Sequence, residues 1–121
     1  MSLRISVRTA NSICIVDLDG DLRLGPDLRA FAAQTAEMLA RQTYAGFVLN
    51  VSRLTQLDSA GLGEVVRFYI TASQKNCRVV LAEASTGILE ILRVTRLDGL
   101  FACYTSEADA LASFRKTAAR G

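Results

Sequence analysis

The chain has 121 residues, the length of one compact domain, and half of its residues are hydrophobic while 21% are charged. This composition excludes an intrinsically disordered chain, and a formal net charge of +2 without any basic tract argues against a nucleic-acid partner. Histidine is absent, which excludes serine–histidine and cysteine–histidine catalysis and every metal site that needs imidazole.

The cysteines and the apolar runs indicate a compartment. Cys14, Cys77 and Cys103 are odd in number, far apart and surrounded by apolar residues, which is typical of free thiols in a reducing environment. No apolar run approaches the roughly 20 residues that cross a bilayer, and the N-terminus lacks the core of a signal peptide. We expect a cytoplasmic protein with no membrane span.

The first third of the chain predicts a β-hairpin followed by a helix. Residues 3–7 alternate between apolar and polar, Ala10-Asn11-Ser12 has turn chemistry, and Ile13–Leu18 is a nearly continuous run of branched apolar residues. The second strand should therefore be the deeper one, and Asp19-Gly20-Asp21 is expected to end it. Gly25-Pro26-Asp27 then has the chemistry of a helix start.

The middle of the chain predicts a short strand, a polar loop and a second helix. Phe47–Val51 is the buried strand, and Asp58-Ser59 precedes an apolar pattern with helical spacing. The residues expected on the core face of this helix are Leu62, Val65, Val66, Tyr69 and Ser73.

The last third repeats the order strand, helix. Cys77–Ala82 and Phe101–Tyr104 are the predicted strands, and Ser85 and Ser106 stand where N-caps of the two following helices are needed. Strands that alternate with helices predict a mostly parallel sheet with right-handed crossovers. We therefore predict a single α/β domain over residues 1–121, with a mixed, mostly parallel sheet, an antiparallel N-terminal edge strand and about four helices.

Ser59 is the candidate functional residue. It should lie where the carboxyl end of a strand meets a helix N-terminus, with an exposed hydroxyl and free backbone N–H groups nearby. Asp-Ser before an apolar helix is also ordinary capping chemistry, so the residues alone leave two interpretations, a helix cap or a functional serine. Gly61 and Gly63 weaken a helix, and they would leave this turn bare for the close approach of a partner's backbone.

A phosphate on Ser59 would act on binding more than on folding. It would add about −1.5 to −2 charges, and the helix N-terminus would stabilise it by roughly 0.3–1 kcal/mol. Asp58 and Asp21 would oppose it. The helix after Ser59 is expected to supply docking residues off its core face, among them Glu64, Arg67 and Phe68. Phe68 has two interpretations, an interface anchor or a flank residue that covers the neighbouring helix.

Four segments resemble STAS domains, the anti-sigma factor antagonist family. Leu57-Asp58-Ser59-Ala60-Gly61-Leu62-Gly63 resembles the family motif. Val48–Val51 is similar to the strand before that motif, Ile91–Phe101 to a later helix and turn, and Asp19–Leu22 to the segment after the second strand. The resemblance covers nearly the whole chain and implies a stand-alone domain with the STAS fold.

The resemblance implies a partner switch. The unmodified antagonist binds an anti-sigma factor that is also a serine kinase, phosphorylation at Ser59 releases it, and a phosphatase restores the first state. The kinase brings ATP, so no cofactor and no enzymatic activity are expected in this chain. The residues expected to contact the partner are Asp21, Arg23, Asp58, Ser59, Gly61, Gly63, Glu64, Arg67 and Phe68.

The chain departs from the family pattern at three positions. Arg23 stands where many members have Asp and could neutralise a phosphoserine, so that phosphorylation would disrupt binding less. Ala60 replaces a frequent Ser or Thr, and Asn50 replaces a common Asp, an exchange expected to matter little.

Two other functions stay open. One is a non-phosphorylated STAS scaffold subunit of a stress-signalling or lipid-transport assembly. The other is an enzyme, for which Ser59 has no adjacent base.

Overall fold

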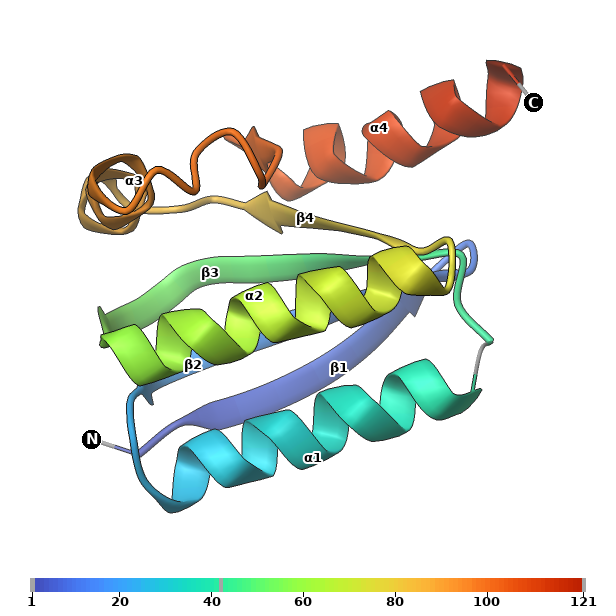
Figure 1. Cartoon of the computed structure of the whole chain (residues 1–121). Helices are drawn as coiled ribbons and strands as arrows, with labels where there is room; N and C mark the ends of the chain where they lie inside the picture. The colour runs from blue at the N-terminus through green and yellow to red at the C-terminus, as the bar shows by residue number, and fades with distance from the viewer. Residues whose placement is uncertain (1, 42, 121) are drawn as a thin grey trace.

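A five-stranded mixed sheet organises the chain in a computed structural model that describes residues 2–41 and 43–120, with side chains as far as residue 115. The strands follow the order β1-β2-β3-β4-β5, and β1 is antiparallel to β2 while the later pairs are parallel (Figure 1). The elements are β1 (Arg4–Ala10), β2 (Ile13–Leu22), α1 (Pro26–Arg41), β3 (Gly46–Leu57), α2 (Ser59–Gln74), β4 (Arg78–Ala82), α3 (Thr86–Val94), β5 (Cys103–Tyr104) and α4 (Glu107–Arg120). This confirms the predicted α/β fold.

The N-terminal hairpin turns on two residues. Asn11 and Ser12 have φ angles of 49° and 73°, the left-handed values that a tight hairpin turn of this length needs. Most of β2 is buried and most of β1 is exposed, which confirms that the second strand is the deeper one.

Both β2 and β3 are longer than predicted. We expected Asp19 to end β2 and a polar loop to follow Val51, but the parallel ladder continues to the pair Leu22 and Leu57, with irregular register after Asp17. The reason lies in the neighbours of β3: residues 46–50 pair with β2 and β4, whereas residues 53–57 pair only with β2. The outer half of β3 is therefore open on one side and tolerates polar side chains.

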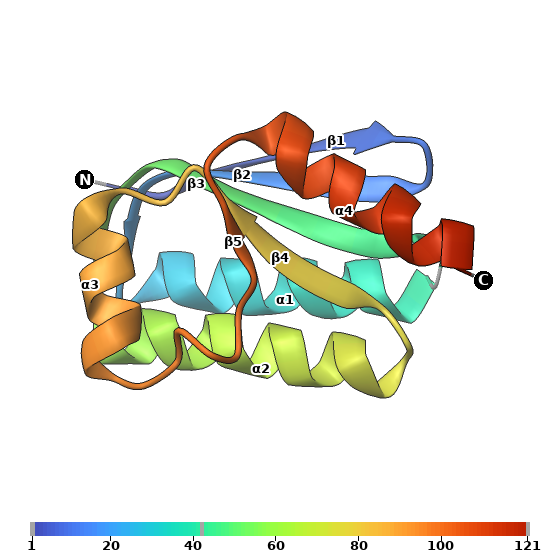
Figure 2. The same ribbon diagram turned by 90° about the horizontal axis from the view of Figure 1, so that it is seen from above.

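Helices cover both faces of the sheet. α1 and α2 pack on one face and α4 lies on the other, as Figure 2 shows from above. The larger core on the α1–α2 side contains a contact chain of three aromatic rings, in which Phe68 lies 6.5 Å from Phe31 and 5.0 Å from Phe47 between ring centroids. A smaller core under α4 contains Ile15 and Ala110.

The prediction for the face of α2 was partly wrong. The buried residues of this helix are Gly61, Leu62, Val65, Phe68 and Ala72. Val66 and Tyr69 are only partly buried and Ser73 is exposed, so the core stripe is rotated toward α1 relative to the prediction. Phe68 is 2% exposed and belongs to the core instead of the docking surface. The cause is tertiary, because α2 must fill the space between the sheet and α1.

The predicted helix starts are confirmed. α1 begins at Pro26. The Ser85 hydroxyl accepts a hydrogen bond of 3.2 Å from the backbone N–H of Ile88, and the Ser106 hydroxyl accepts one of 3.0 Å from the N–H of Asp109. In the described part of the chain, none of these helices has the length and apolar character that crossing a membrane requires.

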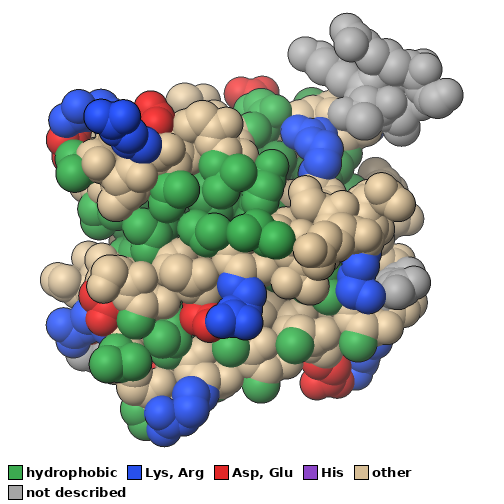
Figure 3. All heavy atoms as spheres, viewed as in Figure 1, with side chains coloured by type: hydrophobic (Ala, Val, Ile, Leu, Met, Phe, Trp, Pro, Cys, Tyr) green, Lys and Arg blue, Asp and Glu red, His purple; other side chains and the backbone are tan. Residues whose placement is uncertain are grey.

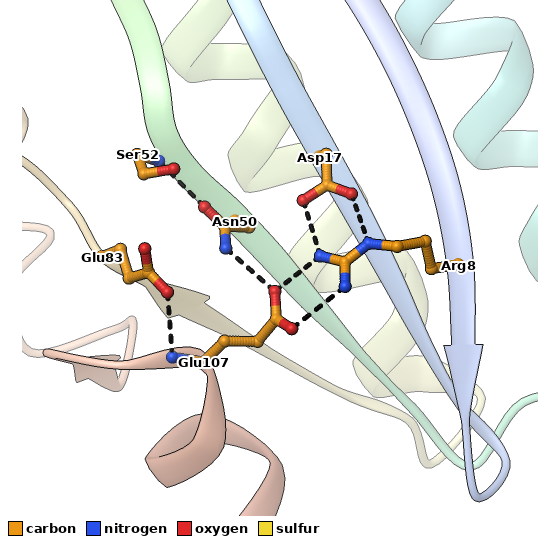
Figure 4. Close-up of polar contacts among 6 residues, drawn as sticks. All are labelled: Arg8, Asp17, Asn50, Ser52, Glu83 and Glu107. Carbon is orange, nitrogen blue, oxygen red and sulfur yellow. Dashed lines mark hydrogen bonds and ion pairs between the residues drawn. The ribbon is translucent and has the colours of Figure 1, made fainter.

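A polar network fastens the start of α4 to the sheet (Figure 4). The Arg8 guanidinium binds both carboxylate oxygens of Asp17, at 2.7 and 2.8 Å, and both oxygens of Glu107, at 3.1 and 2.6 Å. Asn50 donates its side-chain amide to Glu107 at 2.9 Å, and Glu83 accepts from the backbone N–H of Glu107 at 3.1 Å. The Arg8 guanidinium, with a smaller contribution from Asn50, lowers the pKa of Glu107.

The amide at position 50 has defined hydrogen-bond partners in the fold, which the sequence did not predict. We predict that Asn50→Asp lowers the free energy of unfolding by about 1–3 kcal/mol at neutral pH, because it removes a donor and places a second carboxylate beside Glu107. The loss should shrink as the pH falls and either carboxyl group is protonated. Urea denaturation at several pH values measures it.

The matched control for this prediction is the double variant Asn50→Asp with Glu107→Gln. The glutamine amide can donate to the new aspartate, so the double variant should be more stable than the sum of the two single changes. A pH-independent loss, or strictly additive changes, would contradict the proposed repulsion.

Candidate functional site

The candidate site lies at the carboxyl end of β3, where the chain turns into α2. Asp58 is the N-cap of this helix: one carboxylate oxygen accepts from the backbone N–H of Gly61 at 2.8 Å, and the other accepts from the N–H of Leu24 at 3.0 Å. Ser59 is the first helical residue and is exposed. Since Asp58 supplies the cap, helix capping does not account for the hydroxyl of Ser59.

The electrostatics of the site favour a charged Asp58. Hydrogen bonds from the backbone N–H groups of Leu24 and Gly61 lower the pKa of its carboxyl group, and the positive charge of Arg23 lowers it further. Asp58 therefore stays ionised at neutral pH. A second negative charge on the adjacent Ser59 would meet a fixed anion on one side and would lie within the field of a guanidinium.

Asp21 lies inside the fold, whereas Arg23 lies at its surface. Its side chain is buried, accepts a hydrogen bond of 2.8 Å from the Thr55 hydroxyl, and lies 3.3 Å from an Arg23 guanidinium nitrogen. The Thr55 hydrogen bond lowers the pKa of Asp21, and the positive charge of Arg23 makes a much smaller contribution in the same direction. Asp21 thus serves within the fold by positioning Arg23, whose own side chain is half exposed.

The two glycines of the motif differ. A β-carbon on Gly61 would stand 2.1 Å from the carbonyl oxygen of Leu22, so this glycine allows β2 and α2 to approach each other. Gly61 is buried, so the prediction that a partner's backbone approaches this glycine was wrong. Gly63 is exposed and a β-carbon on it would meet open space, so it alone keeps the expected bare surface.

Other predicted docking residues divide into exposed and buried. Arg67 is largely exposed and pairs with the partly buried Glu64 at 3.3 Å, on the same helix as Ser59. Phe68 is absent from this surface. Sequence reasoning missed Leu24, whose side chain is 79% exposed although its backbone N–H binds Asp58. The sequence feature that could have indicated an exposed Leu24 is its place between a charged residue and Gly25-Pro26.

Hydrophobic side chains also gather on the face that carries α2. Figure 3 shows them concentrated in the area between α2 and the segment of α3 above it. Tyr69 and Ile70 of α2 and Leu97 of the segment after α3 have partly buried or exposed apolar side chains, and the Tyr69 ring lies 5.1 Å from that of Phe101. An apolar area beside a charged helix start is typical of a protein-docking surface.

The fold and the site define a small α/β domain in which the end of a strand carries Asp-Ser at a helix N-terminus. Residues 5–102 match the family model described as MlaB, STAS domain. The chain therefore belongs to the STAS domain family.

Solved structures share this fold. A putative anti-sigma factor antagonist from Thermotoga maritima has a TM-score of 0.85 at 18% identity, covering 92% of this chain and 94% of that one. An anti-sigma factor antagonist from Mycobacterium paratuberculosis has a TM-score of 0.84 at 19% identity, covering 94% and 95%. SpoIIAA of Bacillus, in its phosphorylated form, has a TM-score of 0.74 at 17% identity, covering 92% and 99%.

Proposed function

We propose that this protein is a cytoplasmic anti-sigma factor antagonist in a phosphorylation-controlled partner switch. The unmodified form binds an anti-sigma factor with serine kinase activity, phosphorylation at Ser59 releases that partner, and a phosphatase reverses the change. One observation carries the proposal: Ser59 is exposed at a helix start that Asp58 already caps. The likeness to SpoIIAA, a protein with a phosphorylated form, supports it.

The geometry suits a switch that changes binding and spares the fold. A phosphate on Ser59 would lie at the positive end of α2, where an exposed anion gains roughly 0.3–1 kcal/mol. The fixed charge of Asp58 opposes this gain and Arg23 offsets the repulsion. A partner docked on this surface would instead have to desolvate a group with about −1.5 to −2 charges.

The proposed docking surface surrounds Ser59. We define it by the exposed side chains of Leu24 and Arg67, the bare backbone at Gly63, and the Asp58–Arg23 pair. Leu24 is the apolar contact of this surface, and the charged groups give it specificity. The kinase supplies ATP, so the chain itself requires no cofactor and no catalytic group for this role.

Binding of Ser59 variants to a purified kinase-type anti-sigma factor from the same genome tests the proposal. Ser59→Ala should bind like the parent, and Ser59→Asp should bind at least about tenfold more weakly, because the partner must desolvate the new charge. Ser73→Asp is the matched control, since it adds the same charge at an exposed position near the other end of α2. Equal binding by the Ser59 variants would reject the switch.

Arg23 should moderate the switch. We predict that Arg23→Gln makes the Ser59→Asp change more disruptive, by about threefold or more in Kd, because the guanidinium no longer offsets the added charge. The measurement is a double-mutant cycle on partner binding at low and high salt. The coupling should weaken as salt screens it; a cycle without coupling would exclude Arg23 from this role.

The alternative is a scaffold subunit that is never phosphorylated. Such a chain would elute from size-exclusion chromatography of native extract in a stable complex that persists whatever the state of Ser59. A switch component should instead move between a complex and a free pool. An enzymatic role would require turnover that Ser59→Ala abolishes.

A further inference from the structure

A cavity of about 340 Å³ lies at the end of the sheet opposite Ser59. The hairpin turn, the starts of β3 and β4, and α4 surround it, at the right-hand end of the molecule in Figure 1. Twelve residues of β3 separate this end from the α2 start, which corresponds to roughly 35 Å. The cavity is therefore distinct from the proposed phosphorylation site, and nothing in the proposed partner switch uses it.

The wall of the cavity is mainly apolar. Ala10 and Ile13 contribute from the hairpin, Ala45 from the residue just before β3, and Leu111 and Phe114 from α4. Cavities that bind small molecules have volumes of about 300–1,000 Å³ and mostly apolar walls with a few polar groups. This cavity has the size and the lining of the smaller members of that class.

Two arginines and two asparagines, Asn11 and Asn76, supply the polar part of the lining, and the arginines carry its charge. Arg78 and Arg115 both line the cavity, and the described lining contains no aspartate or glutamate. The Arg78 guanidinium is held in position, with its central carbon 4.9 Å from the centroid of the Phe114 ring and one nitrogen 3.5 Å from the backbone carbonyl of Ser113. Its planar fork is thus oriented before a ligand arrives.

Phe114 is also fixed by the backbone beneath it. A β-carbon on Gly46 would stand 2.2 Å from the ring, so the ring rests directly on the first residue of β3. The backbone at Gly46 therefore holds the Phe114 ring in place, and through this ring it also holds the stacked Arg78. A preformed wall of this kind lowers the cost of ordering on binding.

We propose that this cavity binds a small amphipathic carboxylate, with its apolar chain against Ile13, Leu111 and Phe114 and its carboxylate on Arg78 and Arg115. Arginine matches a carboxylate by paired, charge-assisted hydrogen bonds. A neutral head group would form weaker hydrogen bonds with the guanidiniums than a carboxylate does. The volume, at the low end of the range for small-molecule sites, suits a short apolar chain.

Titration of the full chain with decanoate, below the concentration at which it forms micelles, tests the proposal. Amide chemical shifts in two-dimensional NMR should saturate at one site and concentrate in residues 10–13, 45–46, 76–78 and 111–115. Acetate should cause no saturable change, and 1-decanol should bind at least about tenfold more weakly. Equal binding of decanoate and decanol would overturn the role of the arginines, and shifts that spread without saturation would overturn the site.

Variants locate the binding. Arg115→Gln and Arg78→Gln should each weaken decanoate binding about tenfold or more and leave decanol binding unchanged. Arg53→Gln is the matched control, because Arg53 is a largely exposed arginine outside the lining. Ala10→Phe, which fills the cavity from a strand position, should abolish binding of both ligands. An equal effect of Arg53→Gln, or unimpaired binding by Ala10→Phe, would reject the proposal.

Discussion

Phe68→Ala should lower the free energy of unfolding by about 3–5 kcal/mol, the range for removing a buried aromatic side chain. Phe68 is 2% exposed and packs its ring edge-on against Phe31 and Phe47, so the change opens a cavity between α1, α2 and the sheet. Native stabilities are typically only about 5–15 kcal/mol, so much of the stability is at stake. Urea denaturation followed by circular dichroism measures the loss.

The matched control is Ile70→Ala, two residues further along α2, where the side chain is 48% exposed. This change should alter stability by less than about 1 kcal/mol. Phe68→Leu should recover much of the lost stability and bind the anti-sigma partner normally. A folded, fully stable Phe68→Ala protein that fails only to bind would instead restore Phe68 as an interface anchor.

Gly61→Ala should destabilise the protein by about 1–3 kcal/mol, as overpacking of a tight contact does. The added β-carbon would stand 2.1 Å from the carbonyl oxygen of Leu22. Because this atom belongs to the backbone of β2, relief requires α2 or the end of β2 to move. Such a movement would also disturb the hydrogen bonds between Asp58 and the N–H groups of Gly61 and Leu24.

Gly63→Ala controls for helix propensity, since it lies two residues away on the same helix and meets open space. It should stabilise the protein by roughly 0.5–1 kcal/mol, the usual gain from replacing glycine in a helix. Thermal unfolding of the two variants should therefore show a lower Tm for Gly61→Ala and a higher Tm for Gly63→Ala than for the parent protein. Shifts of the same sign would show that Gly61 serves no packing purpose.

The fold could be predicted where the signal is local. Pro26 starts a helix, and Ser85 and Ser106 cap helices, because these effects depend on neighbouring residues alone. The outer half of β3 and the position of Phe68 could not be predicted, because they depend on which strand or helix lies alongside. A strand that pairs on one side only can carry polar residues. The buried face of a helix is set by the neighbouring elements against which it packs.

The candidate site shows the same division. The sequence motif located Asp58 and Ser59 at a helix start, but only the structure assigns the cap to Asp58 and leaves the Ser59 hydroxyl free of that role. Gly61 was predicted to leave a bare surface, but it is a packing contact. The sequence could not show this because the contacting residue, Leu22, lies 39 residues earlier in the chain. Leu24 was overlooked because its hydrogen bond to Asp58 is likewise non-local.

Phosphosite mass spectrometry of the protein isolated from its own cells, separated into partner-bound and free pools, tests the central claim most directly. The switch predicts phosphate on Ser59 in the free pool and unmodified Ser59 in the pool bound to the anti-sigma factor. Ser59→Ala should remain in the bound pool under every condition. An unmodified Ser59 in both pools under all growth conditions, or equal phosphorylation of both, would contradict the account.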